Sequence, residues 1–143
     1  MTELLSALFG AIIGGVITFW GESVYRKRED KAKQQHSASI LYNDLKSIQT
    51  YLNNDFSDVN VNIRYTDEWQ RYVANCAFLE NHDVALLYDI YGAVYGYSTV
   101  FNEFTLLGAE TQPDEQIFKQ LSSKINHQNF KELMDLLSKK TKN

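Results

Sequence analysis

Hydrophobic residues dominate an uninterrupted segment near the N-terminus of the chain. Residues 4–21 read LLSALFGAIIGGVITFWG, contain no charged side chain and are bracketed by Glu3 and Glu22. As an α-helix rising about 1.5 Å per residue, this segment would extend about 27 Å, close to the hydrocarbon thickness of a bilayer. We therefore predict that it crosses a membrane, with residues 1–25 as a transmembrane anchor.

Aromatic and basic residues at the end of this segment predict its orientation. Five Lys/Arg follow it within residues 26–33 and none precedes it; such an excess of positive charge stays on the cytoplasmic side. The predicted membrane-interface residues are Trp20, Tyr25, Arg26, Lys27 and Arg28. The sequence thus predicts a single-pass protein of a bacterial inner (plasma) membrane, with the lipid bilayer as a partner and the C-terminal domain in the cytoplasm.

Two other interpretations of the apolar segment stay open. A cleaved signal peptide needs a basic start and a cleavage site with small residues, whereas this chain starts Met1-Thr2-Glu3 and shows no such site before the charges. A buried helix of a soluble protein is the second alternative. The uncharged length and the basic flank favour an uncleaved anchor.

Small residues form a stripe along the predicted anchor. The stripe consists of Ala7, Gly10, Gly14 and Gly21, at spacings of 3, 4 and 7. Gly10 and Gly14 form a GxxxG pair, which lets two helix backbones approach closely in lipid. We predict homo-oligomerisation through this stripe; the alternative is that glycine is simply frequent in membrane helices.

The pattern after residue 25 predicts helices. A basic juxtamembrane helix covers 26–36, because no proline or glycine interrupts it. An apolar stripe at spacings of 4, 3 and 4 then predicts a helix that packs on a core: Leu41, Leu45, Ile48 and Leu52. Polar residues 53–58 end this helix. Apolar and polar residues alternate over 59–65, but a single strand would have no partner, so we interpret this segment as a loop.

Three or four further helices follow. Thr66 with Asp67 and Glu68 predicts a side-chain cap, Asn81 opens a long helix over 82–107, and Pro113 starts another. The residues predicted to face the core are Trp69, Tyr72, Val73, Cys76, Leu79, Leu87, Ile90, Tyr91, Val94, Phe101, Phe104, Ile117, Phe118, Leu121, Ile125, Phe130, Leu133, Met134 and Leu137. The predicted fold is all-α: one N-terminal transmembrane helix followed by a four- to five-helix cytoplasmic bundle over 37–143.

Two glycines in the long helix, Gly92 and Gly96, are four residues apart. Glycine inside a helix costs up to about 1 kcal/mol relative to alanine. We therefore expect a packing reason, most simply another helix that crosses closely at this point.

The amino-acid composition excludes some kinds of site and makes nucleic acid an unexpected partner. Cys76 is the only cysteine, which excludes an intramolecular disulfide and a cysteine-based zinc site with paired spacing. From Ser37 to Asn143 nine Lys/Arg face fourteen Asp/Glu, a net charge of −5, so phosphate would be repelled on average and we expect no nucleic acid as partner.

Candidate chemistry is sparse. The chain has no phosphate-binding loop, nucleophile elbow, HExxH or EF-hand pattern, and His36, His82 and His127 are far apart. We predict no enzymatic activity and no catalytic, cofactor or metal site. The sharpest ligand hypothesis is an aromatic pocket for a small nucleotide, lined by Tyr88, Tyr91 and Tyr95; the alternative is a helix packed on both sides.

The overall arrangement resembles a known type of protein. The start GAIIGGVITFWGE followed by RKRED, then an amphipathic helix, a Trp-led helix and a longer tyrosine-bearing helix, is similar to a loose class of small bacterial and prophage proteins with a glycine-rich signal anchor and a cytoplasmic helical domain. The likeness is architectural and covers most of the chain. It implies no activity and no site residues, and it favours a role in phage conflict only slightly.

We therefore expect a noncatalytic, membrane-tethered helical module that oligomerises through its anchor and recruits or senses a protein partner or small ligand. The alternative is a membrane-disrupting effector of an anti-phage defence or toxin system, triggered through the cytoplasmic domain.

Overall fold

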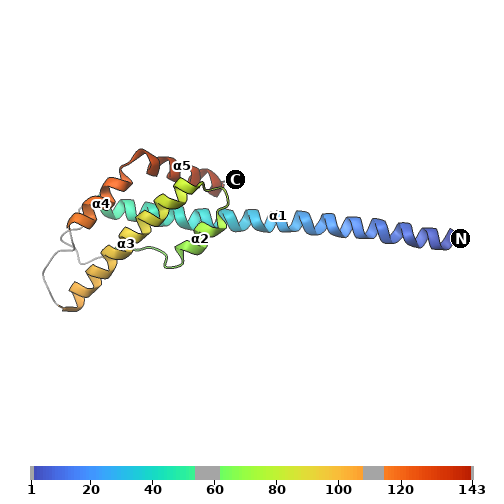
Figure 1. Cartoon of the computed structure of the whole chain (residues 1–143), viewed down its shortest axis with the longest axis horizontal. Coiled ribbons are helices and arrows are strands. Elements are labelled where there is room, and N and C mark those ends of the chain that lie inside the picture. Colours follow the sequence, from blue (N-terminus) through green and yellow to red (C-terminus); the bar gives the residue numbers. More distant parts are fainter. Residues whose placement is uncertain (1, 54–61, 108–114, 143) are drawn as a thin grey trace. The chain divides into compact units, whose positions relative to one another are not determined.

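The computed structural model of the chain is all-helical (Figure 1). It describes the backbone of residues 2–53, 62–107 and 115–142, and the side chains of residues 21, 22, 24–53, 62–102, 116 and 118–142. The helices within these residues are α1 (Thr2–Asn53), α2 (Trp69–Asn75), α3 (Asn81–Leu107), α4 (Glu115–Ile125) and α5 (Gln128–Lys142). The predicted all-α class and the helical bundle are confirmed.

The chain divides into two compact units, Met1–Lys33 and Gln34–Asn143. In the first unit the described side chains are exposed to solvent, and Arg26 forms an ion pair with Glu22 one helical turn earlier. This pair is of the i,i+4 type, which stabilises an exposed helix by about 0.3–0.5 kcal/mol.

Where side chains are described, no helix is long and apolar enough to cross a membrane. The predicted anchor, 4–21, lies outside that part of the chain except for Gly21. Ala7, Gly10, Gly14 and Trp20 therefore lie outside the described side chains, and the transmembrane helix stays a prediction.

The core of the second unit is formed by the predicted apolar stripes. Leu41, Leu45 and Ile48 of α1 are 0% exposed, while α3 packs against α4 and α5, and α4 against α5. The other helices contribute Trp69, Val73, Leu87, Ile90, Tyr91, Val94, Leu121, Ile125, Phe130, Leu133 and Leu137, and Cys76, which directly follows the end of α2, is buried as well. Complete burial of such a side chain stabilises the fold by about 1.5–3 kcal/mol. Phe104 and Ile117 lie outside the described side chains.

Residues 62–66, which precede α2 and are called the extended segment below, contain neither helix nor strand, as predicted. Ile63 within them is buried in the core. The Asn62 side chain fastens the segment to α3: its Nδ2 donates to Ser98 Oγ at 2.8 Å and to Asn102 Oδ1 at 3.1 Å. Val59 and Val61 lie outside the described residues.

The start of α2 differs from the prediction. The helix begins at Trp69 rather than beside Thr66, and its N-cap residue, Glu68, makes no side-chain cap. The prediction that Thr66 caps this helix is therefore wrong. Its backbone N–H and its hydroxyl instead donate to the two carboxylate oxygens of Asp44, at 2.9 and 3.0 Å, because a charged acceptor binds a donor more strongly than a neutral one.

The expectation of a close helix crossing at Gly92 and Gly96 is also wrong. A Cβ atom added at either position would meet no heavy atom within 4 Å. Both glycines lie on the side of α3 that is turned away from Leu87, Ile90 and Val94, so no neighbouring helix of the second unit requires them.

Candidate functional site

The aromatic residues of α2 and α3 form a stacked cluster. The rings of Trp69 and Tyr91 are parallel, with centroids 4.5 Å apart, and the ring of Tyr88 meets Trp69 edge-on at 4.7 Å. Stacked and edge-to-face pairs each contribute about 0.5–1.5 kcal/mol beyond the buried area. The cluster therefore holds α2 on α3.

Tyr91 belongs to the core, and its buried hydroxyl forms a hydrogen bond. It is 0% exposed and its hydroxyl donates to Asp44 Oδ2 at 3.2 Å. Burial, followed by the nearby Asp44 carboxylate and the hydrogen bond to it, raises the pKa of Tyr91 well above its usual value. A phenol in this position stays neutral and acts as a structural donor.

The three tyrosines of the predicted pocket therefore lie in different surroundings. Tyr91 is enclosed, Tyr88 is 51% exposed and Tyr95 is 63% exposed. The structure brings Tyr88 and Tyr91 together through Trp69 and leaves Tyr95 on the surface. The nucleotide pocket at these residues stays a prediction.

A separate cleft lies along α1, on the side turned away from Leu41, Leu45 and Ile48. It has a volume of about 420 Å³ and is open to solvent. The described residues that line it, all polar or charged, are Asn43, Lys46, Ser47, Thr50, Tyr51, Asn62 and Arg64. No carboxylate is among them, although the second unit is acidic overall.

The positions of these residues follow from local structure. Asn43 and Lys46, and likewise Ser47 and Thr50, are three residues apart, and Lys46 and Thr50 are four apart, so these residues share one broad face of α1. Because Ile63 points into the core, Asn62 and Arg64 on either side of it fall on the opposite side of the extended segment and reach the cleft.

The floor of the cleft is fixed by a tyrosine pair. Tyr51 is 8% exposed and its hydroxyl lies 3.1 Å from the hydroxyl of Tyr97, with the two rings edge-on. Burial, followed by the hydrogen bond to Tyr51, raises the pKa of Tyr97. The Thr50 hydroxyl is engaged as well, since it donates to the Lys46 carbonyl oxygen at 2.8 Å.

Comparison with protein-family models, with curated proteins and with solved structures found no match to this chain. The site is therefore interpreted from its own geometry.

The cations of the cleft distinguish it from the surrounding surface. Between Gln34 and Phe118 the sequence contains three Lys/Arg: Lys46, Arg64 and Arg71. Arg71 pairs with Glu68 at 3.2 Å, whereas Lys46 and Arg64 have no ion-pair partner among the described residues. Both unpaired cations of this stretch therefore line one cleft.

The sequence interpretation missed this cleft. The one feature of the sequence that could have indicated it is the scarcity of Lys and Arg over more than eighty residues. Which of these cations line the same cleft depends on the fold and not on their spacing in the sequence.

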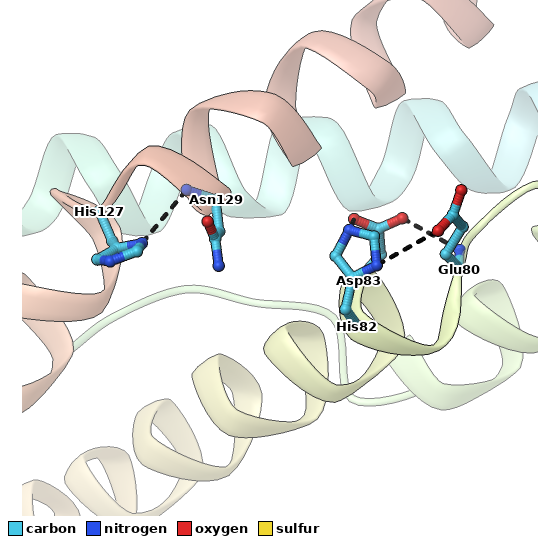
Figure 2. Close-up of polar contacts among 5 residues, drawn as sticks. All are labelled: Glu80, His82, Asp83, His127 and Asn129. Atoms are coloured by element: carbon cyan, nitrogen blue, oxygen red, sulfur yellow. Dashed lines mark hydrogen bonds and ion pairs between the residues drawn. The ribbon is translucent and has the colours of Figure 1, made fainter.

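Asp83 and His127 act as caps at the helix starts (Figure 2). The backbone N–H of Glu80 donates to Asp83 Oδ2 at 3.1 Å, as in half of a capping box, and His82 lies 3.4 Å from Asp83 Oδ1. At the start of α5, His127 Nδ1 accepts from the Asn129 backbone N–H at 3.3 Å. Among the residues searched, no three His, Cys, Asp or Glu form a group that could hold a metal ion.

Asp89 on α3 forms an exposed ion pair with α4. Its Oδ2 lies 2.8 Å from Lys124 Nζ.

The predicted interface residues that the structure describes are all on the surface of α1. Tyr25 is 69% exposed, Arg26, Lys27 and Arg28 are exposed, and a Cβ on Gly21 would meet nothing within 4 Å. The aromatic ring and the basic side chains are therefore accessible to solvent, with Arg26 paired to Glu22.

Proposed function

We propose that this chain is a membrane-tethered, noncatalytic helical module. Residues 4–21 anchor it in a bilayer, and the unit Gln34–Asn143 recruits or senses a partner on the cytoplasmic side. The observation that carries the proposal is the uncharged run of eighteen residues followed at once by five Lys/Arg.

Two features of α1 support the tether. The backbone is helical from Thr2 onward, which is the conformation that satisfies every backbone hydrogen bond within a bilayer. The residues that follow the run are exposed and basic, as expected where anionic headgroups attract positive charge.

The second unit supports an interaction role. It has its own core, and it presents an open cleft with unpaired cations on one side and the exposed rings of Tyr88 and Tyr95 on another. Recognition needs such accessible groups on a rigid framework, and nothing in it requires a chemical reaction.

Membrane flotation of the full-length chain tests the tether. Lysine near the middle of a membrane helix costs about 2.5–3.5 kcal/mol, so Ile13→Lys combined with Val16→Lys opposes insertion by about 5–7 kcal/mol. We expect the wild type to float with vesicles in a density gradient and to resist carbonate extraction, and the double variant to stay at the bottom of the gradient.

Val24→Lys combined with Ala32→Lys is the matched control, because both positions lie beyond the run and are exposed. This control should float like the wild type. A wild-type chain that remains soluble without detergent, with its first twenty residues intact, would contradict the proposal.

A further inference from the structure

We propose that the cleft along α1 binds a phosphate ester of a small organic molecule, with Lys46 and Arg64 supplying the positive charge. This inference rests on one part of the proposed function, the sensing role of Gln34–Asn143, for which it names the class of ligand. The binding itself is independent of the tether and can be measured in detergent.

Charge is the first step of the argument. The second unit carries an excess of carboxylates, yet the described residues that line the cleft include two cations and no carboxylate. The nearest acidic residue along α1, Asp44, is occupied elsewhere, since its two oxygens accept from Thr66 and Tyr91. An anion in the cleft therefore meets attraction from Lys46 and Arg64, and no carboxylate among the described lining residues opposes it.

Hydrogen-bonding capacity is the second step. The side chains of Lys46 and Arg64, together with those of Asn43 and Ser47, have no partner among the described residues. Guanidinium and ammonium groups supply several donors, and the amide and hydroxyl add neutral ones. A phosphate group has more acceptor oxygens than a carboxylate, so it makes fuller use of this donor set.

Shape is the third step. The volume of about 420 Å³ lies within the range of small-molecule sites, about 300–1,000 Å³. The ring of Tyr51 and the aliphatic stems of Lys46 and Arg64 add apolar surface to the polar wall. The cleft thus suits an organic phosphate better than a bare ion, and a nucleoside monophosphate is a probe of the right class.

Binding to the full-length chain in detergent tests the assignment by calorimetry or thermal shift. The probes are inorganic phosphate, adenosine monophosphate, adenosine and dihexanoyl-phosphatidylglycerol below its micelle concentration. We expect saturable binding of adenosine monophosphate that weakens with salt, and binding of adenosine at least tenfold weaker.

The variant Lys46→Gln with Arg64→Gln should weaken binding of the phosphate ester at least tenfold. Its charge-matched control is Lys131→Gln with Lys139→Gln, at two exposed positions of α5 that should leave the affinity unchanged. Equal thermal unfolding of the two variants without ligand shows that both are folded.

The outcomes separate the sources of the phosphate. Binding of adenosine monophosphate supports a soluble metabolite, and binding of the lipid alone supports a phospholipid headgroup in the same cleft, provided that the cleft variant loses it. The inference is overturned if no phosphate probe binds saturably, if adenosine binds as well as its phosphate, or if the control variant loses binding equally. Flotation of the chain with membranes is expected whichever of these results is obtained, so failure of this inference is distinguishable from failure of the proposed tether.

Discussion

Asp44 on α1 and Tyr91 on α3 are 47 residues apart in sequence, and the buried Tyr91 hydroxyl donates a 3.2 Å hydrogen bond to the Asp44 carboxylate. The same carboxylate accepts the N–H and hydroxyl of Thr66, while Trp69 stacks on the Tyr91 ring. One side chain therefore joins α1, α3 and the segment that leads into α2. The Asp44 carboxylate is therefore occupied by these donors, and Asp44 is not among the described residues that line the cleft.

Tyr91→Phe should lower the free energy of unfolding by about 1.5–3 kcal/mol, since hydrogen bonds to charged groups contribute about that much. Urea unfolding of the full chain in detergent, followed by circular dichroism, measures the change. Tyr88→Phe is the control, because Tyr88 is half exposed and a surface substitution alters stability by about 0.5 kcal/mol or less.

A double-mutant cycle with Asp44→Asn tests whether the hydrogen bond is the cause. Residues in direct contact show coupling energies of about 0.5–3 kcal/mol, whereas independent sites add. Strict additivity of Tyr91→Phe and Asp44→Asn would mean that the two side chains do not interact.

Stability should fall at alkaline pH. Burial raises the pKa of Tyr91 and Tyr97 above the ordinary value of 10.0, and raises the pKa of Cys76 from 9.0 to about 11. The unfolded chain therefore loses protons that the folded chain keeps. The stabilisation is complete below pH 9, begins to decline between 9.0 and 11 through Cys76, and declines further above pH 10 through the tyrosines.

Unfolding measured across this range, together with the ultraviolet absorbance of tyrosinate, checks this pH dependence. Tyr97→Phe should make the decline above pH 10 shallower, by up to about 1.4 kcal/mol per pH unit. Tyr88→Phe, at an exposed tyrosine, should leave the slope unchanged. A decline that is identical in wild type and Tyr97→Phe would contradict the assigned role of this buried phenol.

Gly92→Ala and Gly96→Ala should each raise the free energy of unfolding by about 0.5–1 kcal/mol. Alanine is the better helix former, and a methyl group at either position meets nothing within 4 Å. Ala85→Gly, at an exposed position of the same helix, should lower stability by a similar amount. Destabilisation by Gly92→Ala would show that a partner absent from this structure packs against that face of α3.

Helix positions and core faces followed from the sequence because periodicity is a local property. The spacing of Leu41, Leu45 and Ile48 predicts which side of α1 is buried, and the structure confirms this prediction. The ends of the helices followed less well from the sequence. Thr66 is a residue type that commonly caps a helix, but its hydroxyl binds the carboxylate of Asp44, 22 residues earlier.

The candidate site could not be predicted in this way. Lys46 and Arg64 line the same cleft because one side of α1 and one side of the extended segment both face it. The position of the extended segment depends on the burial of Ile63 in the core and on the hydrogen bond from Asn62 to α3. In the sequence the two cations are eighteen residues apart, and no local pattern links them. Gly92 and Gly96 illustrate the opposite error, since their spacing suggested a close contact that the second unit does not contain.

Oligomerisation of the proposed anchor should depend on Gly10 and Gly14. Small residues four apart permit close backbone contact in lipid, so Gly10→Leu and Gly14→Leu should each reduce the crosslinked dimer of the full-length chain in native membranes. Gly15→Leu, on another face of the same helix, is the matched control and should leave crosslinking unchanged. Equal dimer yields in all three variants would place any self-association outside the glycine stripe.

Membrane potential separates a tether from a membrane-disrupting effector. We expect expression of the full-length chain to leave the potential unchanged, as reported by a potential-sensitive dye, because a helix without charged residues is poorly suited to line a water-filled pore. Rapid depolarisation by the wild type that Gly14→Leu abolishes and Gly15→Leu retains would favour the effector instead. Flotation of both variants must accompany the assay, since only a variant that still reaches the membrane shows that the glycine stripe, and not insertion itself, causes the leak.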